Sequence, residues 1–440
     1  MQKIATVSKY IFLGLLAYMP VHIFLSTIIG VNVGWLDLMK ALKDIVLMFG
    51  FCLVAFASIR QPWFTAWLKN SLTVVIIVYV LVTGFLALVR PTDIDAEILG
   101  VVYNTRFLVF FLYASLLQHH FNSKKLQKAA VKTVLVVASC VVGFGIVQYA
   151  VLPDDALRNL GFTRENGVFP AFFIDDKPDL ERVMSTVRDP NSLGSYLIVI
   201  IPLIVASFYQ ARQKQKKWWL VYLLASFVCM YVTFSRSAWL GLVASLAVFA
   251  GLSAYKRQRI RISNNTKRTA LITGLVGFIV VAGLLFVGRD SYYVQNVILH
   301  SDESTVQEDP NELRIRFWQE SVQSISDQPL GSGPGTAGLA SIRNNIQGTQ
   351  LNENYYLQIA TEVGFIGISL FILILIIPGI RLYHLARENI YALALFASFV
   401  GLIITNFLVH IWSNEAVAYT WWGLAGLFII YKPKAKHTKV

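Results

Sequence analysis

Charged residues are scarce in this chain of 440 residues: they make up 14% of it, whereas soluble globular proteins carry about 25%. Hydrophobic residues reach 56% and fall in blocks of roughly 20, a length that crosses a bilayer. Such a composition excludes a disordered chain, a coiled coil, a collagen and a disulfide-stabilised scaffold. It predicts an all-α, polytopic transmembrane helical bundle.

Metal-ligating residues are also few. The three cysteines, Cys52, Cys140 and Cys229, lie in separate apolar blocks without a CxxC pair, so no zinc site or disulfide framework is predicted. No two histidines have ligand spacing, and the acidic pairs Asp175-Asp176 and Asp302-Glu303 are typical of solvated turns. Phosphate-loop, dinucleotide and nucleophile-elbow motifs are missing. We therefore expect no metal and no cofactor.

Twelve apolar segments of membrane-spanning length follow one another along the chain. We expect them at residues 10–30, 36–59, 71–89, 97–118, 130–152, 192–210, 218–234, 237–255, 269–287, 355–379, 389–410 and 416–431. Only Ser235 and Arg236 separate the seventh segment from the eighth, which predicts a short turn between them.

The distribution of basic residues predicts the orientation. If the N terminus lies inside, alternate loops on that side are rich in lysine and arginine and contain one acid, Glu388. This pattern follows the positive-inside rule, so both termini are expected in the cytoplasm. The net charge of +13 is then a topology signal, and its scatter over short segments predicts no nucleic-acid partner.

Residues 1–440 are predicted to form a single transmembrane domain with two long loops on the outside. The first loop spans 152–191 and the second 288–354, and long loops on a rigid scaffold often carry function. We expect the second loop, which is larger, to carry part of the site.

The large loop is predicted to be partly helical. Asp309-Pro310-Asn311-Glu312 has the residue order of a helix start, with a cap, a proline and an acid. The helix is expected to end before Pro329. Its apolar face is predicted to consist of Leu313, Phe317, Val322 and Ile325.

Charges within or against apolar segments are functional candidates, with internal ion pairs as the alternative. Here they are Arg106, Arg236, Asp37 and Glu362.

Arginine, rather than lysine, gathers on the predicted outer side. Its planar fork of donors suits phosphate oxygens, which suggests an anionic, phosphate-bearing ligand. A salt-bridge network with the acids of the same loops is the alternative. The outer arginines are Arg90, Arg158, Arg164, Arg182, Arg188, Arg289, Arg314, Arg316 and Arg343.

Several short motifs occur in a set order, densest between residues 180 and 370. They are Arg182-x3-Thr186-x3-Pro190-Asn191-Ser192-Leu193, Thr233-Phe234-Ser235-Arg236-Ser237-Ala238, Arg314-Ile315-Arg316-Phe317-Trp318, Pro329-Leu330-Gly331-Ser332-Gly333, Glu353-Asn354-Tyr355-Tyr356-Leu357 and Glu362-x-Gly364-x-x-Gly367. Together with the twelve segments, this set resembles the O-antigen ligase and O-antigen polymerase family of bacterial envelope glycosyltransferases.

The resemblance implies a metal-independent enzyme of the bacterial cytoplasmic membrane. It would move a glycan from undecaprenyl pyrophosphate to an acceptor sugar hydroxyl, either as a ligase or as a polymerase, with its active site facing outside. In the ligases, arginines matching Arg182 and Arg314 are thought to hold the pyrophosphate. The proposed base is a histidine in a His-Asn-x-x-Leu context. That position here is Glu353, followed by matching Asn354 and Leu357.

We therefore expect Arg182, Arg236 and Arg314 to bind the pyrophosphate, with Arg188 and Arg316 as neighbours able to replace them. Fixed guanidinium donors would stabilise the charge that develops as the pyrophosphate departs.

Glu353 is the expected catalytic base, and Asn354 and Tyr356 are expected to position either Glu353 or the sugar. A glutamate with an ordinary pKa of about 4.3 is ionised and able to accept a proton. The alternative is an acid that only complements a helix N-terminus. At the level of the whole protein, the competing function is a lipid or glycan transporter without bond-forming activity. Transporters often have related halves, and no internal repeat is evident.

Overall fold

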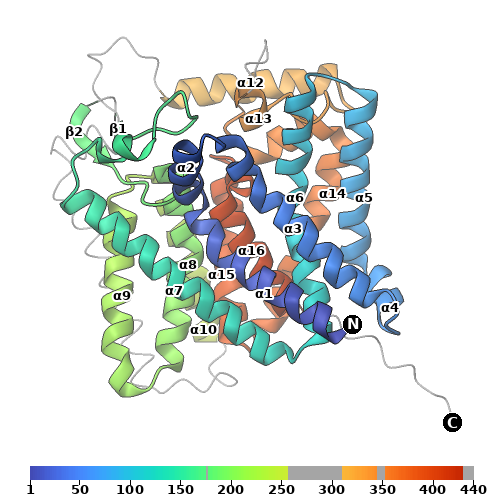
Figure 1. Cartoon of the computed structure of the whole chain (residues 1–440), viewed down its shortest axis with the longest axis horizontal. Helices are drawn as coiled ribbons and strands as arrows, with labels where there is room; N and C mark the ends of the chain where they lie inside the picture. The colour runs from blue at the N-terminus through green and yellow to red at the C-terminus, as the bar shows by residue number, and fades with distance from the viewer. Residues whose placement is uncertain (175–176, 256–309, 344–351, 430–440) are drawn as a thin grey trace.

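The computed structural model describes residues 1–174, 177–255, 310–343 and 352–429. Helices account for nearly all regular structure in these ranges, and one two-stranded hairpin is the only sheet within them (Figure 1). Eight described helices are long and apolar enough to cross a membrane. The predicted class, an all-α polytopic bundle, is confirmed.

The helices follow the predicted apolar segments closely. They are α1 (Gln2–Tyr18), α2 (His22–Val33), α3 (Leu36–Ser58), α4 (Phe64–Leu68), α5 (Ser71–Val89), α6 (Ile94–His120), α7 (Ser123–Ala150), α8 (Pro190–Gln210), α9 (Gln213–Tyr231), α10 (Arg236–Tyr255), α12 (Pro310–Asp327), α13 (Gly338–Arg343), α14 (Tyr355–Leu385), α15 (Ile390–Asn406) and α16 (Glu415–Phe428), with the 3-10 turns η1 (Met19–Val21), η2 (Ala156–Leu160) and η4 (Ile411–Ser413). Each predicted segment coincides with one of them, with two exceptions: 10–30 covers parts of α1 and α2, and 269–287 lies outside the described residues.

The bundle has a protein-buried centre and a periphery that faces outward. In the most apolar part of α8, 83% of residues are buried, and in that of α6, 72% are. The corresponding share in α5 is 28%, and its Leu81, Phe85 and Leu88 are exposed. A continuous exposed apolar face of this kind suits contact with lipid.

Short polar side chains begin many of the helices. Each of these residues accepts at least one backbone N–H of the first turn, as a helix cap does. They are Asn70 before α5, Asp93 before α6, Asn122 before α7, Asp189 before α8, Asn354 before α14, Asn389 before α15 and Asn414 before α16. Asp189, Asn354 and Asn414 belong to segments that return in the candidate site.

The first predicted segment, 10–30, is interrupted. Pro20 lies in η1 between α1 and α2, because a proline has no N–H to continue the helical ladder. The apolar run continues across the proline, and for that reason a single segment was predicted here.

The described parts of both long loops lie at one end of the bundle, opposite to the N terminus (Figure 1). The first contains η2 and the antiparallel strands β1 (Phe172–Ile174) and β2 (Lys177–Arg182), which pair Phe172 with Arg182 and Phe173 with Glu181. The described part of the second loop contains α12 and α13, and α12 lies across the end of the bundle.

The bounds of α12, Pro310–Asp327, confirm the helix predicted after Asp309. One member of its predicted buried face is wrong: Val322 is 55% exposed. Four-residue steps from Phe317 lead to Ser321 and Ile325, and these two are buried. Val322 is rotated by about 100° from Ser321 and therefore points away.

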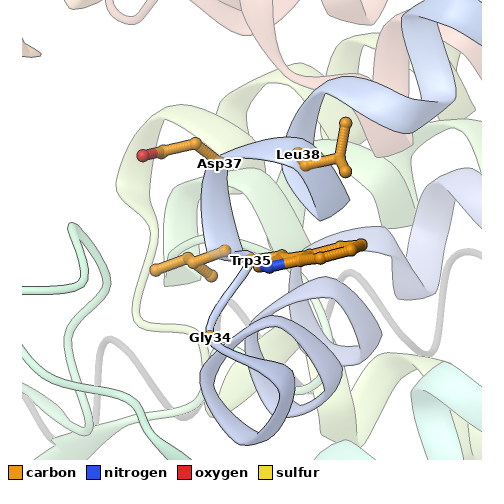
Figure 2. Close-up of a pocket in the computed structure, with 5 residues that line it drawn as sticks. Gly34, Trp35, Asp37 and Leu38 are labelled. Carbon is orange, nitrogen blue, oxygen red and sulfur yellow. The ribbon is translucent and has the colours of Figure 1, made fainter.

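A shallow depression of about 370 Å³ lies at the turn between α2 and α3 (Figure 2). It is lined by residues 34–38. Of the charges singled out from the sequence it contains Asp37, and it contains none of the residues expected to bind the pyrophosphate or to act as the base. Trp35, in this turn, is 61% exposed. An exposed tryptophan at the end of a membrane helix suits the interfacial layer of a bilayer.

Candidate active site

Three non-glycine residues in the described parts of the chain have positive φ angles. They are Ser185, at 54°, Phe234, at 47°, and Glu353, at 41°. A left-handed conformation costs such residues about 1–3 kcal/mol each, and strained residues cluster at functional sites. In the sequence, Ser185 is three residues from both Arg182 and Arg188, and Phe234 is two residues before Arg236; Glu353 is itself a predicted site residue.

Arg182 connects the loop before α8 to the turn between α9 and α10. Its Nε donates to the backbone oxygen of Thr233 at 3.1 Å, and its Nη2 donates to Oδ1 of Asn191 at 2.9 Å. Next to it, the N–H of Val183 donates to the oxygen of Val232 at 3.0 Å. Two motifs about 50 residues apart in sequence are thus joined at one point.

Arg236, the first residue of α10, lies close enough to Arg182 to affect its titration. Burial and the positive charge of Arg236 lower the pKa of Arg182, while Asp189 opposes them. Two neighbouring guanidinium groups repel each other, and a bound anion would relieve that repulsion. This cluster therefore has the charge of an anion site.

Arg314 of α12 and Glu353 form an ion pair, in which Nε donates to Oε2 at 2.9 Å. The two side chains are 24% and 35% exposed, so the pair is open to a ligand from solvent. A guanidinium has five N–H donors, and this hydrogen bond uses one of them. The predicted base and one predicted pyrophosphate ligand are therefore neighbours.

Asn354 and Tyr356 both stabilise the start of α14. Oδ1 of Asn354 accepts the N–H groups of Tyr356 and Leu357, so Asn354 is the helix cap. Glu353 lies outside the helix, in its left-handed conformation. The hydroxyl of Tyr356 donates to the oxygen of Ile403 at 3.0 Å, and its ring packs on Phe407. In this arrangement Tyr356 anchors α14 to α15.

The end of α15 contacts the starts of both α14 and α10. Tyr356 contacts it from the Glu353 side, as described above. From the other side, Oγ1 of Thr405 donates to the oxygen of Ser237, the residue after Arg236. The starts of α10 and α14 therefore flank the same short segment.

Arg188 lies on a different side of the α8 start. Burial acts to lower its pKa, but Tyr103, Glu415 and Asp189 together raise it above the usual value, and Tyr103 also forms a hydrogen bond with it. Acidic and phenolic neighbours therefore outweigh burial at Arg188, whereas at Arg182 the pKa is lowered although Asp189 is close to both.

Arg188 adjoins a buried charge network within the bundle. Nη2 of Arg106 lies 3.0 Å from Oε1 of Glu415 and donates to the oxygen of Ser413 at 2.8 Å. Lys43 lies 3.1 Å from Asp44 and 3.7 Å from Glu415. Arg106, one of the intramembrane charges singled out from the sequence, is therefore paired internally.

Arg316 lies two residues after Arg314 and faces away from it. Its Nε is 3.9 Å from Oε1 of Glu320, and its guanidinium lies 5.9 Å from the centre of the Phe317 ring. The side chain is 52% exposed. In this conformation Arg314, rather than Arg316, lies against Glu353.

Two polar residues of the site were missed from the sequence. Asp189 caps α8 through the N–H and hydroxyl of Ser192, and it lies next to Arg182. The Asp189-Pro190 pair was a usable signal, since it is typical of a helix start. Asn352 is fully buried and donates to Oγ of Ser321 and Oγ1 of Thr361. Nothing local in the sequence marks it.

In the described residues, no group of three His, Cys, Asp or Glu side chains is arranged to hold a metal ion. The acidic pairs Asp175-Asp176 and Asp302-Glu303 lie outside those residues, as does the stretch 288–309 of the large loop.

Comparison with known families gives one match. Residues 221–372 fit the family model described as O-antigen ligase. The matched range contains Arg236, Arg314 and Glu353, whereas Arg182 and Arg188 precede it. A comparison with curated proteins finds no match.

Proposed function

We propose that the chain is a membrane glycosyltransferase of the O-antigen ligase and polymerase family, and that it transfers a glycan from undecaprenyl pyrophosphate to an acceptor sugar hydroxyl. The match of residues 221–372 to the O-antigen ligase family model supports this proposal. The family implies lipid-linked glycan substrates and a bacterial inner-membrane location. The observation that carries the finer proposal is that the Arg314–Glu353 pair and the Arg182–Arg236 pair lie at the starts of two helices, α14 and α10, that contact the same segment of α15.

The pyrophosphate is the proposed ligand of Arg182, Arg236 and Arg314. Guanidinium groups bind phosphate oxygens with two parallel hydrogen bonds and keep their charge at any relevant pH. Arg182 is already held by Thr233 and Asn191, so its orientation needs little reorganisation when the donor binds. Arg188 and Arg316 remain proposed neighbours, and each has an acidic residue close by.

Glu353 is the proposed base. Its carboxylate takes the proton of the acceptor hydroxyl, and the hydroxyl oxygen forms a bond to the anomeric carbon of the donor glycan. The bond from that carbon to the pyrophosphate oxygen breaks, and its electron pair leaves with the lipid pyrophosphate. When the guanidinium of Arg314 also binds the phosphates, its positive charge is shared between the phosphates and Glu353. The ion pair with Glu353 is then weaker, and the carboxylate accepts a proton more readily.

The reading of Glu353 as a helix-start acid has less support. Asn354 performs the capping of α14, and the first turn of that helix contains no acid. A carboxylate that only served the helix dipole would not need a strained backbone or an arginine partner outside the helix.

We propose that this end of the bundle faces the outside of the cell. The opposite end joins segments that the charge pattern places in the cytoplasm: Arg381 donates to Asn70, and Gln118 donates to the oxygen of Ile429. Lysines and arginines dominate the loops of that opposite end, as the positive-inside rule requires.

Reconstitution tests the proposal. The purified protein is placed in liposomes with an undecaprenyl-pyrophosphate-linked oligosaccharide and a glycan acceptor, and products are scored by mass spectrometry. A new glycosidic bond supports transfer. Movement of the labelled lipid between leaflets without a new bond would instead support the transporter.

A further inference from the structure

Helix α14 is broken at Gly364, where φ is 70° and ψ is −169°. The break leaves backbone groups of three residues without partners inside the helix. The glycine-rich loop after α12 supplies them: the N–H of Ser332 donates to the oxygen of Thr361, and that of Gly333 to the oxygen of Glu362. Backbone groups freed inside a membrane helix must be satisfied by neighbouring protein.

The contact also runs in the other direction, since the N–H of Phe365 donates to the oxygen of Pro329 at 3.0 Å. Only glycine fits parts of this loop. A Cβ on Gly331 would lie 2.6 Å from the oxygen of Glu362, and one on Gly335 would lie 2.1 Å from the oxygen of Ala96. The loop is therefore wedged between α14 and α6.

The side chain of Glu362 joins this loop to α14 and α6 by hydrogen bonds. It is fully buried, and its Oε1 accepts the N–H groups of Gly335 at 2.9 Å and of Ala337 at 3.3 Å. Its Oε2 accepts Nδ2 of Asn104 in α6. Backbone N–H groups that converge in a glycine-rich turn form a nest for an anion, and here the anion is the protein's own carboxylate.

The same loop continues directly from α12, which carries Arg314. Midway along α12, Ser321 is tied to Thr361 through Asn352. Contacts that fix α12 against α14 thus lie near both ends of α12: the loop held by Glu362 follows one end, and the Arg314–Glu353 pair lies towards the other.

We propose that Glu362 is a positioning residue for the transfer reaction: through the glycine-rich loop it holds α12 in register, and so keeps Arg314 in contact with Glu353. This inference rests on the proposed function. Glu362 touches neither substrate, and its effect passes through Arg314.

The amide isostere offers a sharp control. In Glu362→Gln, Oε1 still accepts from Gly335 and Ala337. Oδ1 of Asn104 is buried without a hydrogen-bond partner. If the Asn104 amide flips, this oxygen can accept an N–H of the new glutamine side chain. Glu362→Gln should therefore transfer glycan at close to the wild-type rate. Glu362→Ala removes every hydrogen bond of the Glu362 carboxylate. It should slow transfer by about 10–10²-fold, because small misplacements of catalytic groups have effects of that size.

A double-mutant cycle separates positioning from general stability. If Glu362 acts through Arg314, then Glu362→Ala should have little further effect on transfer in an Arg314→Ala background. Multiplicative losses in the double variant would overturn the proposal, as would equal damage by Glu362→Gln and Glu362→Ala. Asn104→Ala, which removes one of the donors to Glu362, replaces Glu362→Ala in the cycle if the latter fails to fold.

A second readout does not depend on activity. Cysteines placed at Arg314 and Glu353, in a chain with Cys52, Cys140 and Cys229 replaced by alanine, should cross-link efficiently with a short bifunctional thiol reagent. Adding Glu362→Ala should lower the cross-linking rate several-fold, and an unchanged rate would refute the positioning role. Failure of the proposed function would appear differently, as a wild-type protein that makes no glycosidic bond.

Discussion

Replacing Glu353 with glutamine should abolish most transfer while leaving the fold intact. Glutamine keeps the shape of the side chain, and its oxygen can still accept Nε–H of Arg314, but it cannot take a proton. Loss of a general base slows a reaction by about 10²–10⁴-fold, which raises the barrier by about 2.7–5.4 kcal/mol.

The structural cost of the same change is smaller. The Arg314–Glu353 pair is 24% and 35% exposed, and solvent screens such pairs, so its ionic part contributes about 0.5–1 kcal/mol. The predicted catalytic loss exceeds this by several-fold. The two effects can therefore be separated in one variant by measuring initial transfer rates, donor binding and thermal unfolding.

The chain offers a matched control on the same helix. Arg316 and Glu320 form a second, looser pair at 3.9 Å on α12. Glu320→Gln removes a carboxylate from an arginine as Glu353→Gln does, and it should leave transfer within about twofold of wild type, as expected for an exposed pair. Glu353→His should retain partial activity if the position matches the ligase histidine. Near-normal transfer by Glu353→Gln, with donor binding unchanged, would refute the assignment of Glu353 as the base.

Further predictions concern charge, metal, topology and pH. Arg314→Ala and Arg182→Ala should each weaken donor binding by about 1.5–3 kcal/mol. Arg314→Lys should recover only part of this loss, because a point charge lacks the bidentate fork of donors. Unaltered binding isotherms would count against both arginines as pyrophosphate ligands. Transfer should persist in EDTA, and loss restored by magnesium or manganese would oppose arginine as the neutralising group. Reporter tags should place Lys125 inside and Gln307 outside, and a cytoplasmic signal at Gln307 would reverse the orientation. Burial raises the pKa of Glu181 from its usual 4.5 to about 7. The folded protein therefore favours the protonated carboxyl, and the stability that this gives is present below pH 4.5 and is lost as the pH rises through about 7. Between about pH 5 and pH 8, wild type should therefore lose melting temperature relative to Glu181→Gln, and parallel profiles would contradict this.

Much of the fold was predictable because lipid imposes long apolar runs that survive in the sequence. The bounds of α5 and α12 agree closely with the prediction for the same reason: caps and prolines mark their ends. The breaks at Pro20 and Gly364 were not predicted. In both places the apolar run continues through the interruption, and the groups that satisfy the broken helix come from elsewhere in the chain.

The site was predictable in its residue types but not in its pairings. Arginine enrichment and the motif order drew attention to Arg182, Arg314 and Glu353. The bond from Arg182 to the Thr233 backbone spans 51 residues, and a backbone acceptor leaves no trace in composition. Asn352 is similar, since a single buried amide between two hydroxyls has no local pattern.

The identity of the lipid product tests the central claim most directly. If arginines stabilise a departing pyrophosphate while Glu353 activates the acceptor, the bond to the anomeric carbon is the one that breaks. Mass spectrometry of the reconstituted reaction should then find glycosylated acceptor and undecaprenyl pyrophosphate in equal amounts, with both phosphates still on the lipid. Undecaprenyl monophosphate together with a phosphorylated sugar, or donor lipid that stays intact while the protein is active, would contradict the account.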